Sequence, residues 1–175
     1  MSLANYLTLS RIIILPLFLF LFFSSYVHNE LIAGLVLILS SLTDFFDGYI
    51  ARKYNQTTKL GRLLDPLADK LTVIAVFIAF AIKDLLPLEI IIIIVAREFI
   101  VLIGSMIVYF NEEDIINPSK IGKAATFLLY VSALSYIFDL KGLKTIIFVA
   151  LGLTIISALH YSIKAILYFF NNEEI

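Results

Sequence analysis

Apolar residues occur in six long runs that short polar segments separate. Each run is close to the ~20 residues that an α-helix needs to cross the hydrocarbon of a bilayer. The pattern predicts an all-α, polytopic membrane protein with six transmembrane helices, at about residues 7–26, 31–51, 62–82, 87–110, 121–138 and 144–170. The isoleucine-rich stretch 90–96 favours a strand by propensity alone, but a backbone surrounded by lipid must satisfy its own hydrogen bonds, so we expect a helix there too.

Composition supports a membrane protein and limits the number of domains, the partners and the chemistry that the chain can have. The 175 residues are 61% hydrophobic and 15% charged, and the mean hydropathy is +1.01. Six spans leave no room for a second domain, so we expect residues 1–175 to form a single transmembrane domain. A net charge of −1 argues against a nucleic-acid partner, and the absence of cysteine excludes disulfides, thiol catalysis and thiolate metal sites.

The basic residues predict how the chain is oriented. A cleaved signal peptide is an alternative for the first run, but no small-residue cleavage site follows it and five more apolar runs do. With six spans both termini share one side of the membrane. Because lysine and arginine collect on the cytoplasmic side, we expect both termini and the active site to be cytoplasmic in a multi-pass protein of the cell (inner) membrane. The basic residues on the side of the termini are Arg11, Arg52, Lys53, Lys59, Arg62, Lys120 and Lys123, against Lys83, Lys141 and Lys144 on the other.

Four aspartates interrupt the second and third apolar runs, where an unpaired carboxylate costs roughly 2.5 to 3.5 kcal/mol. Asp44 and Asp47 are three residues apart, and Asp65 and Asp69 are four apart, so each pair lies along one helix face. Four converging carboxylates match the oxygen ligands that divalent cations prefer, and we expect two such ions, Mg²⁺ or Mn²⁺. Helix capping and interhelical salt bridges are the alternative.

The surroundings of these aspartates suit a phosphate-bearing ligand. At about 1.5 Å per residue the carboxylates lie roughly 5 to 12 Å from the ends of their helices, which is the depth of lipid phosphates. Gly48 and Ala51 share the face of Asp44 and Asp47 and leave the backbone open to a ligand. Arg52 follows on that face as a bidentate phosphate binder.

The same residues resemble the signature of the CDP-alcohol phosphotransferase family. Eight residues separate Arg52 from Gly61, three separate Gly61 from Asp65, and three separate Asp65 from Asp69. The fixed positions that agree with the family signature are Asp44, Asp47, Gly48, Ala51, Arg52, Gly61, Asp65 and Asp69. The segment Asn5 to Arg11 also resembles the amino-terminal part of the family, and the six spans match its plan.

The resemblance implies a reaction in which the hydroxyl of a small alcohol attacks the lipid-bearing phosphorus of CDP-diacylglycerol and CMP departs. It implies that the four aspartates hold the metal ions and that Asp69 is also the general base. It further implies that CDP binds to Thr8, Asp47, Gly48, Ala51, Arg52, Thr58 and Gly61. Homodimerisation is likewise expected from the resemblance.

The acceptor is suggested by two segments, 65–71 and 97–99, which resemble the phosphatidylglycerophosphate synthase branch of that family. The implied acceptor is glycerol 3-phosphate, whose phosphate needs fixed cations; Arg97, Lys120 and Lys123 are the candidates. An ion pair of Arg97 with Glu98 is the alternative for that residue, and ordinary cytoplasmic charge is the alternative for the two lysines.

Other acceptors and other classes stay open at this stage. Ser105, Ala125 and Leu129 stand where that branch often carries Arg, Lys and Gln, which leaves inositol phosphate, serine or another polyol as alternative acceptors. An intramembrane prenyltransferase would also use aspartates and magnesium, but in two motifs far apart in the chain. A cation transporter would favour inverted repeats and broken helices near the midplane, and neither is evident here.

Overall fold

The computed structural model of the chain contains six α-helices and one short 3₁₀ helix in the residues that it describes. These are residues 3–53, 59–110 and 120–172, with side chains described for 13–43, 67–104, 106 and 120–159. The elements are α1 (Leu3–Phe23), α2 (Asn29–Lys53), α3 (Lys59–Ile82), α4 (Leu88–Phe110), α5 (Lys120–Ile137), η1 (Lys141–Leu143) and α6 (Ile146–Asn172). The described part of the chain has no strand, so the prediction of an all-α protein is confirmed.

Each of the six apolar runs forms one of these α-helices. The helix starts differ most from the prediction: α1 and α3 begin at Leu3 and Lys59, about one turn before the predicted residues 7 and 62. The 3₁₀ turn at Lys141–Leu143 was not predicted, and it delays the start of α6 to Ile146. Pro16 lies inside α1, a position that helices in apolar surroundings tolerate when neighbouring groups satisfy the freed backbone carbonyl.

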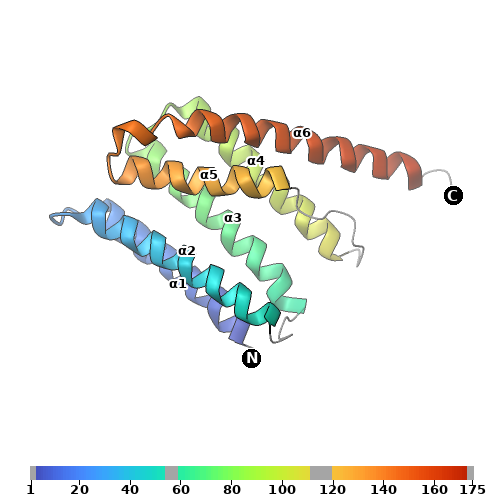
Figure 1. Cartoon of the computed structure of the whole chain (residues 1–175), viewed down its shortest axis with the longest axis horizontal. Helices are drawn as coiled ribbons and strands as arrows, with labels where there is room; N and C mark the ends of the chain where they lie inside the picture. Colours follow the sequence, from blue (N-terminus) through green and yellow to red (C-terminus); the bar gives the residue numbers. More distant parts are fainter. Residues whose placement is uncertain (1–2, 54–58, 111–119, 173–175) are drawn as a thin grey trace.

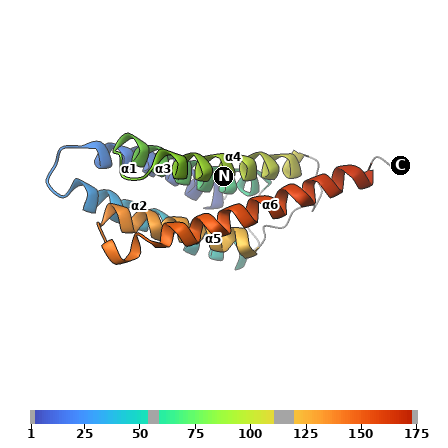
Figure 2. The same ribbon diagram turned by 90° about the horizontal axis from the view of Figure 1, so that it is seen from above.

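Successive helices run in opposite directions along one bundle (Figures 1 and 2). The turns that follow α1, α3 and α5 lie at one end of the bundle. The last residues of α2 and α4 and the first residues of α1, α3 and α5 point towards the other end. The most extensive packing joins α1 with α2, α3 with α4 and α5 with α6, whereas α2 touches α5 over a shorter region. The α2 and α3 ends that carry the aspartates therefore share one end of the bundle.

A cluster of aromatic rings ties three helices together near the turn end. Phe22 of α1 lies 5.9 Å from Phe80 of α3 between ring centroids, and Phe80 lies 6.0 Å from Tyr136 of α5. Phe18 stacks on Phe22 at 5.5 Å, and Phe77 meets Phe80 edge to face at 5.6 Å. The four phenylalanines are at most 1% exposed, and aromatic pairs in such geometries add roughly 0.5 to 1.5 kcal/mol each beyond the area they bury.

Two of the turns at this end are closed by an aspartate in the left-handed conformation. Asp84 after α3 and Asp139 after α5 have φ of 52° and 50°. This left-handed conformation is common just after the end of a helix, where the residue is usually glycine. The amide of Leu85 donates back across the end of α3 at 3.0 Å, and that of Leu140 does so across the end of α5 at 2.8 Å. Lys144 donates to Asp139 at 2.6 Å, and this hydrogen bond lowers the pKa of the exposed Asp139 carboxyl.

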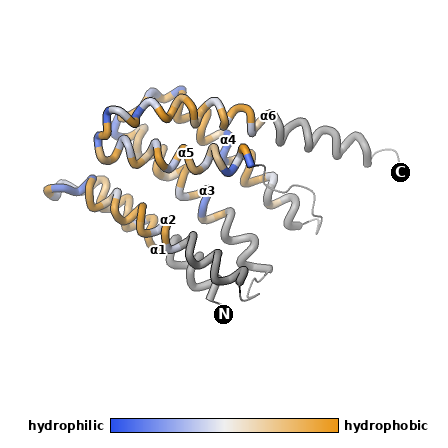
Figure 3. The backbone as a smooth tube through the Cα atoms, in the orientation of Figure 1, coloured by the Kyte–Doolittle hydropathy of each residue, from blue (hydrophilic) through white to orange (hydrophobic). Residues whose placement is uncertain are grey.

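Hydrophobic residues make up most of the described helices (Figure 3), and many of their large side chains are exposed, which is rare for a soluble monomer. Ile13, Phe20, Phe127, Phe148 and Leu159 are each more than half exposed. Within the described side chains, the stretch Lys141–Leu159 is long and apolar enough to cross a membrane, and Ile13–Phe23 and Asn29–Thr43 are shorter apolar helices. Hydrophilic segments lie at the turns and in short stretches of α3 and α4, where Lys70, Arg97 and Glu98 are buried.

The contact between α2 and α5 depends on Gly34. A Cβ added there would lie 2.5 Å from the Phe138 ring and 3.0 Å from the Ile137 side chain. We expect Gly34→Val to destabilise the protein by about 1 to 3 kcal/mol through overpacking, measured as a lower melting temperature in detergent. Gly152→Val in α6 is the matched control, because a Cβ at that position meets no atom within 4 Å; an equal loss in both variants would contradict this account.

Candidate active site

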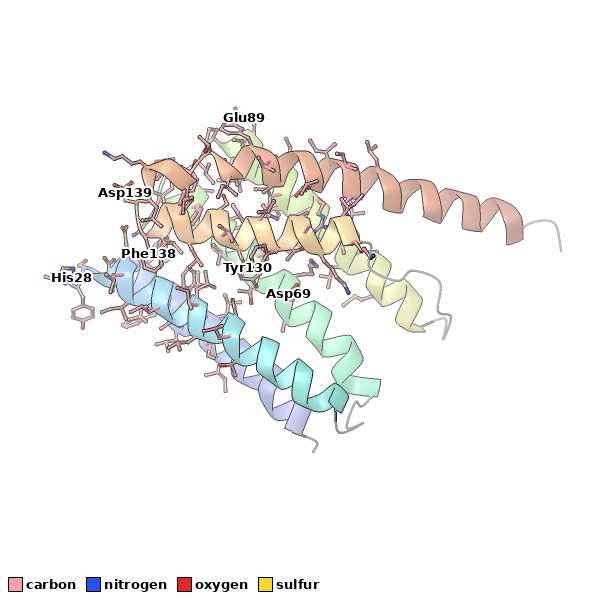
Figure 4. All side chains as sticks on the ribbon, viewed as in Figure 1. His28, Asp69, Glu89, Tyr130, Phe138 and Asp139 are labelled. Carbon is pink, nitrogen blue, oxygen red and sulfur yellow. The ribbon has the colours of Figure 1, made fainter. Side chains whose placement is uncertain are left out.

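Asp69 lies in the middle of α3 (Figure 4), and each of its two carboxylate oxygens lies near a polar group of another residue. Tyr130 of α5 donates its hydroxyl to Asp69 Oδ1 at 3.3 Å, and Lys70 Nζ lies 3.7 Å from Oδ2. The Asp69 side chain is 32% exposed, whereas that of Lys70 is 10% exposed. A carboxylate that is held by neighbours and still open on one side can exchange a proton or bind a cation.

Next to Asp69, three helices share a buried cluster of charges. Glu98 of α4 is fully buried, and its Oε2 lies 2.9 Å from Lys70 Nζ. Its other oxygen accepts a hydrogen bond from Arg97 Nη1, and the Arg97 side chain is 3% exposed. Thr126 of α5 accepts from Lys70 at 3.2 Å. The Glu98 carboxylate is thus shared by two cations inside the bundle.

Arg97 also reaches the beginning of α5. Its Nη2 donates to the Gly122 carbonyl and to Ser157 of α6, both at 3.4 Å, and its Nε has no hydrogen-bond partner among the described residues. Gly122 lies on the first turn of α5 between the exposed Lys120 and Lys123. The ion pair of Arg97 with Glu98, one of the two interpretations of this arginine, is therefore observed, and Arg97 also contacts the backbone of the helical turn that carries Lys120 and Lys123.

The other three aspartates lie on the helix segments that adjoin Asp69. Asp44 and Asp47 fall within the last three turns of α2, and Asp65 lies one turn before Asp69 on α3. Their side chains lie outside the described residues. The helix bounds put Asp47 and Asp65 about 9 Å, and Asp44 and Asp69 about 14 to 15 Å, from the nearer helix end at 1.5 Å per residue, somewhat deeper than the sequence predicted, because both helices extend further.

The donor chemistry of this region fits a divalent cation. Two aspartates in the last half of α2 and two in the first half of α3 offer carboxylate oxygens, the ligands that Mg²⁺ and Mn²⁺ prefer. Among the residues with described side chains, no three metal-binding groups come together. Of the four aspartates, only Asp69 has a described side chain.

The residues predicted to bind CDP map onto the same end of the bundle. Thr8 lies on α1, Gly48, Ala51 and Arg52 lie near the end of α2, and Gly61 lies on the first turn of α3. Their side-chain environments are outside the described residues, and Thr58 falls in the segment 54–58, which lies outside them altogether. Their shared location, the end where α1 and α3 begin and α2 ends, is visible in Figure 1.

A cleft of about 350 Å³ opens beside Asp69 between α2, α3 and α5. Its polar wall carries Asp69 with hydroxyl groups, and its remaining wall is mostly apolar. The lining residues are Ile38, Ser40, Ser41, Leu42, Asp69, Thr72, Phe127, Tyr130, Val131 and Leu134. Such a space can receive a molecule with a polar group at the carboxylate and an apolar portion beyond it.

Sequence reasoning missed Tyr130 and the role of Lys70 at this site. No pattern in the sequence distinguishes Tyr130 or Lys70 from the residues around it. Tyr130 and Asp69 are also 61 positions apart in the chain, so only the fold brings them into contact. Glu98 entered only as a partner for Arg97. The signal that could have singled it out is its position inside an apolar run, because an intramembrane acid indicates a functional site with a nearby partner.

Comparison with known proteins defines the class. The model of the CDP-alcohol phosphatidyltransferase family matches residues 1–157, and the chain belongs to this family. The membership removes the prenyltransferase and transporter alternatives.

Individual relatives show which members of the family the chain resembles. The chain is 37% identical over 173 residues to a CDP-diacylglycerol--glycerol-3-phosphate 3-phosphatidyltransferase of Rickettsia typhi, covering 91% of this chain and 94% of the relative. A protein of the same name from Bacillus subtilis is 37% identical over 147 residues, 76% of each chain. A cardiolipin synthase (CMP-forming) of Streptomyces coelicolor is 34% identical over 146 residues, 81% of this chain and 68% of the relative.

Proposed function

We propose that the protein is a transferase of phospholipid biosynthesis that moves the phosphatidyl group of CDP-diacylglycerol to glycerol 3-phosphate, giving phosphatidylglycerophosphate and CMP. The observation that carries the proposal is the 37% identity to a relative of that name over 91% of this chain. The aspartate signature on α2 and α3 and the cleft beside Asp69 support the same chemistry.

In this proposal Asp44, Asp47, Asp65 and Asp69 hold two divalent cations, Mg²⁺ or Mn²⁺. When bound, such ions neutralise the pyrophosphate and the departing phosphate. The four aspartates supply the negative charge that retains them, and their position on the halves of α2 and α3 that lie towards the same end of the bundle supports the assignment.

Asp69 acts in addition as the general base. The acceptor oxygen forms a bond to the phosphorus of the phosphatidyl group while its proton passes to the Asp69 carboxylate. The bond from that phosphorus to the oxygen of the cytidylate phosphate breaks, and CMP leaves with the bonding electrons. The partial exposure of Asp69 and its place on the cleft wall support this role.

Substrate binding divides between two groups of residues. CDP is bound by Thr8, Asp47, Gly48, Ala51, Arg52, Thr58 and Gly61, where the glycines and alanine let the nucleotide approach the helix and Arg52 pairs with phosphate. The phosphate of the acceptor is bound by Arg97, Lys120 and Lys123. Because Arg97 is buried and paired with Glu98, only its N–H groups that do not bind Glu98 can donate to the acceptor phosphate. The exposed Lys120 and Lys123 therefore contribute more to binding that phosphate.

We further propose that residues 1–175 form one domain with six membrane spans, in the inner membrane, and that both termini and the active site face the cytoplasm. The apolar surface of the bundle and the alternating direction of its helices support this topology. A homodimer is proposed from family likeness alone.

The acceptor is tested by supplying the purified protein with CDP-diacylglycerol, Mg²⁺ and one of four alcohols, and by following the release of CMP. The alcohols are glycerol 3-phosphate, inositol phosphate, serine and phosphatidylglycerol, the last because a cardiolipin synthase is among the relatives. We expect release with glycerol 3-phosphate to exceed that with serine by about 100-fold or more, because a site built around fixed cations rejects an acceptor that leaves them unpaired. Inositol phosphate and phosphatidylglycerol carry phosphate but differ from glycerol 3-phosphate in size, and we expect less release with them as well. Release with another alcohol alone would overturn the assignment of the acceptor and keep the class of reaction.

A further inference from the structure

In the buried cluster beside Asp69, the Lys70 ammonium lies at unequal distances from two carboxylates. Among the described side chains, three oxygens lie within 4 Å of the Lys70 ammonium: Glu98 Oε2 at 2.9 Å, Thr126 Oγ1 at 3.2 Å and Asp69 Oδ2 at 3.7 Å. Lys70 is therefore held closer to the fully buried Glu98 than to the partly exposed Asp69. The two carboxylates compete for one ammonium ion, and Glu98 is the nearer partner.

We propose that Glu98 is a positioning residue that restrains Lys70 and so keeps the Asp69 carboxylate available for the reaction. This inference rests on the proposed function, in which Asp69 is the base. Glu98 lies on α4 and does not reach Asp69 itself; it acts through Lys70, which neighbours Asp69 on α3.

The physical reason lies in what a buried cation does when one partner is removed. In a region with little water, an ammonium that loses its carboxylate is left uncompensated and moves to the nearest remaining anion. For Lys70 that anion is Asp69, only 3.7 Å away. A closer Lys70 would occupy a lone pair of Asp69 that the acceptor proton needs, and it would pull the carboxylate away from the Tyr130 hydroxyl on its other oxygen.

Interhelical attachment alone would not produce this arrangement. An attachment between α3 and α4 is served by any pair of opposite charges, wherever it lies along the helices. Here the pair adjoins Asp69, the proposed base, and Thr126 and Tyr130, one turn apart on α5, contact Lys70 and Asp69 respectively. The second cation, Arg97, keeps Glu98 in place from the opposite side.

The test is a rescue experiment on the full-length protein in detergent. Glu98→Gln keeps the shape of the side chain and removes its charge, and we expect kcat to fall by about 10- to 100-fold while KM for glycerol 3-phosphate changes by less than about threefold. Adding Lys70→Gln removes the ammonium that closes on Asp69, so the double variant should regain about tenfold in kcat over Glu98→Gln alone. Removing the uncompensated ammonium would also restore stability if Glu98 only attaches helices, so kcat is measured per mole of folded protein at a temperature where both variants are fully folded. Under that condition a helix-attaching role predicts equal kcat in the two variants, and only a positioning role predicts recovery.

A double variant that is as slow as Glu98→Gln, or slower, would overturn the proposal. If Glu98→Gln alone fails to fold, the comparison becomes Lys70→Gln against the double variant; the proposal requires their kcat values to agree within about threefold, and a larger loss overturns it. Ser132→Ala is the control, since this buried hydroxyl on α5 has no hydrogen-bond partner among the described residues and should leave kcat unchanged.

Two further readouts separate this inference from the proposed function. The rise in melting temperature that CDP with Mg²⁺ gives the wild-type protein should be retained in Glu98→Gln, because the positioning of Asp69 affects turnover more than nucleotide binding. Failure of the wild-type protein to form phosphatidylglycerophosphate would overturn the proposed function, whereas a wild-type product without rescue overturns only the role of Glu98.

Discussion

Asp69→Asn is expected to lower the catalytic rate by roughly 10² to 10⁴ while the affinity for CDP-diacylglycerol falls only modestly. Asparagine has nearly the same volume as aspartate and keeps one oxygen that can bind a cation, but it cannot accept the proton of the acceptor hydroxyl. The Tyr130 hydroxyl can still donate to that oxygen, so the local packing of α3 on α5 should persist.

The measurement separates binding from rate, with CDP-diacylglycerol affinity taken from titration and kcat from CMP release. Asp84→Asn is the matched control, because it makes the same chemical change in an exposed turn at the other end of the bundle. If affinity and rate fall in parallel in Asp69→Asn and additional Mg²⁺ restores both, Asp69 is a metal ligand only, and another group or water takes the proton.

Asp44→Asn, Asp47→Asn and Asp65→Asn should each abolish metal-dependent turnover, with losses of about 100-fold or more at low Mg²⁺. Each substitution removes a charged ligand from a shared group of carboxylates. The protein should still fold, because the substitutions relieve repulsion among like charges. Mn²⁺ binding to the purified variants, followed by calorimetry, gives a readout that does not depend on turnover.

A variant that retains wild-type activity at low Mg²⁺ and binds Mn²⁺ as tightly as the wild-type protein would remove that aspartate from the metal site. If all three variants behaved in that way, the four aspartates would not form a common site, and the proposed function would have to place its cations elsewhere.

The helices could be predicted from the sequence because apolar length determines them. A run of about 20 apolar residues has one stable backbone conformation in lipid, and each such run here forms a helix. The ends were less predictable. Residues such as Lys59 and Asn29 are polar and lie before the apolar pattern begins, yet they continue the helix.

The candidate site could be predicted only where its residues follow one another in the chain. The spacing of Asp44 to Asp69 marks the aspartates because helix geometry places three- and four-residue intervals on one face. The contacts of Glu98 with Lys70 and of Tyr130 with Asp69 depend on how α4 and α5 pack against α3. No local pattern encodes that packing, so these partners had to be found in the fold.

The most direct test of the proposed function identifies the products formed from CDP-diacylglycerol and glycerol 3-phosphate that carries ¹⁸O in its attacking hydroxyl. Attack on the lipid-bearing phosphorus leaves the label in phosphatidylglycerophosphate, and the CMP that is released carries none. Mass spectrometry of both products reads this outcome. The proposed function predicts labelled phosphatidylglycerophosphate and unlabelled CMP in equal amounts; phosphatidate together with a labelled phosphodiester of cytidylate and glycerol 3-phosphate, or CMP released without any new lipid, would contradict it.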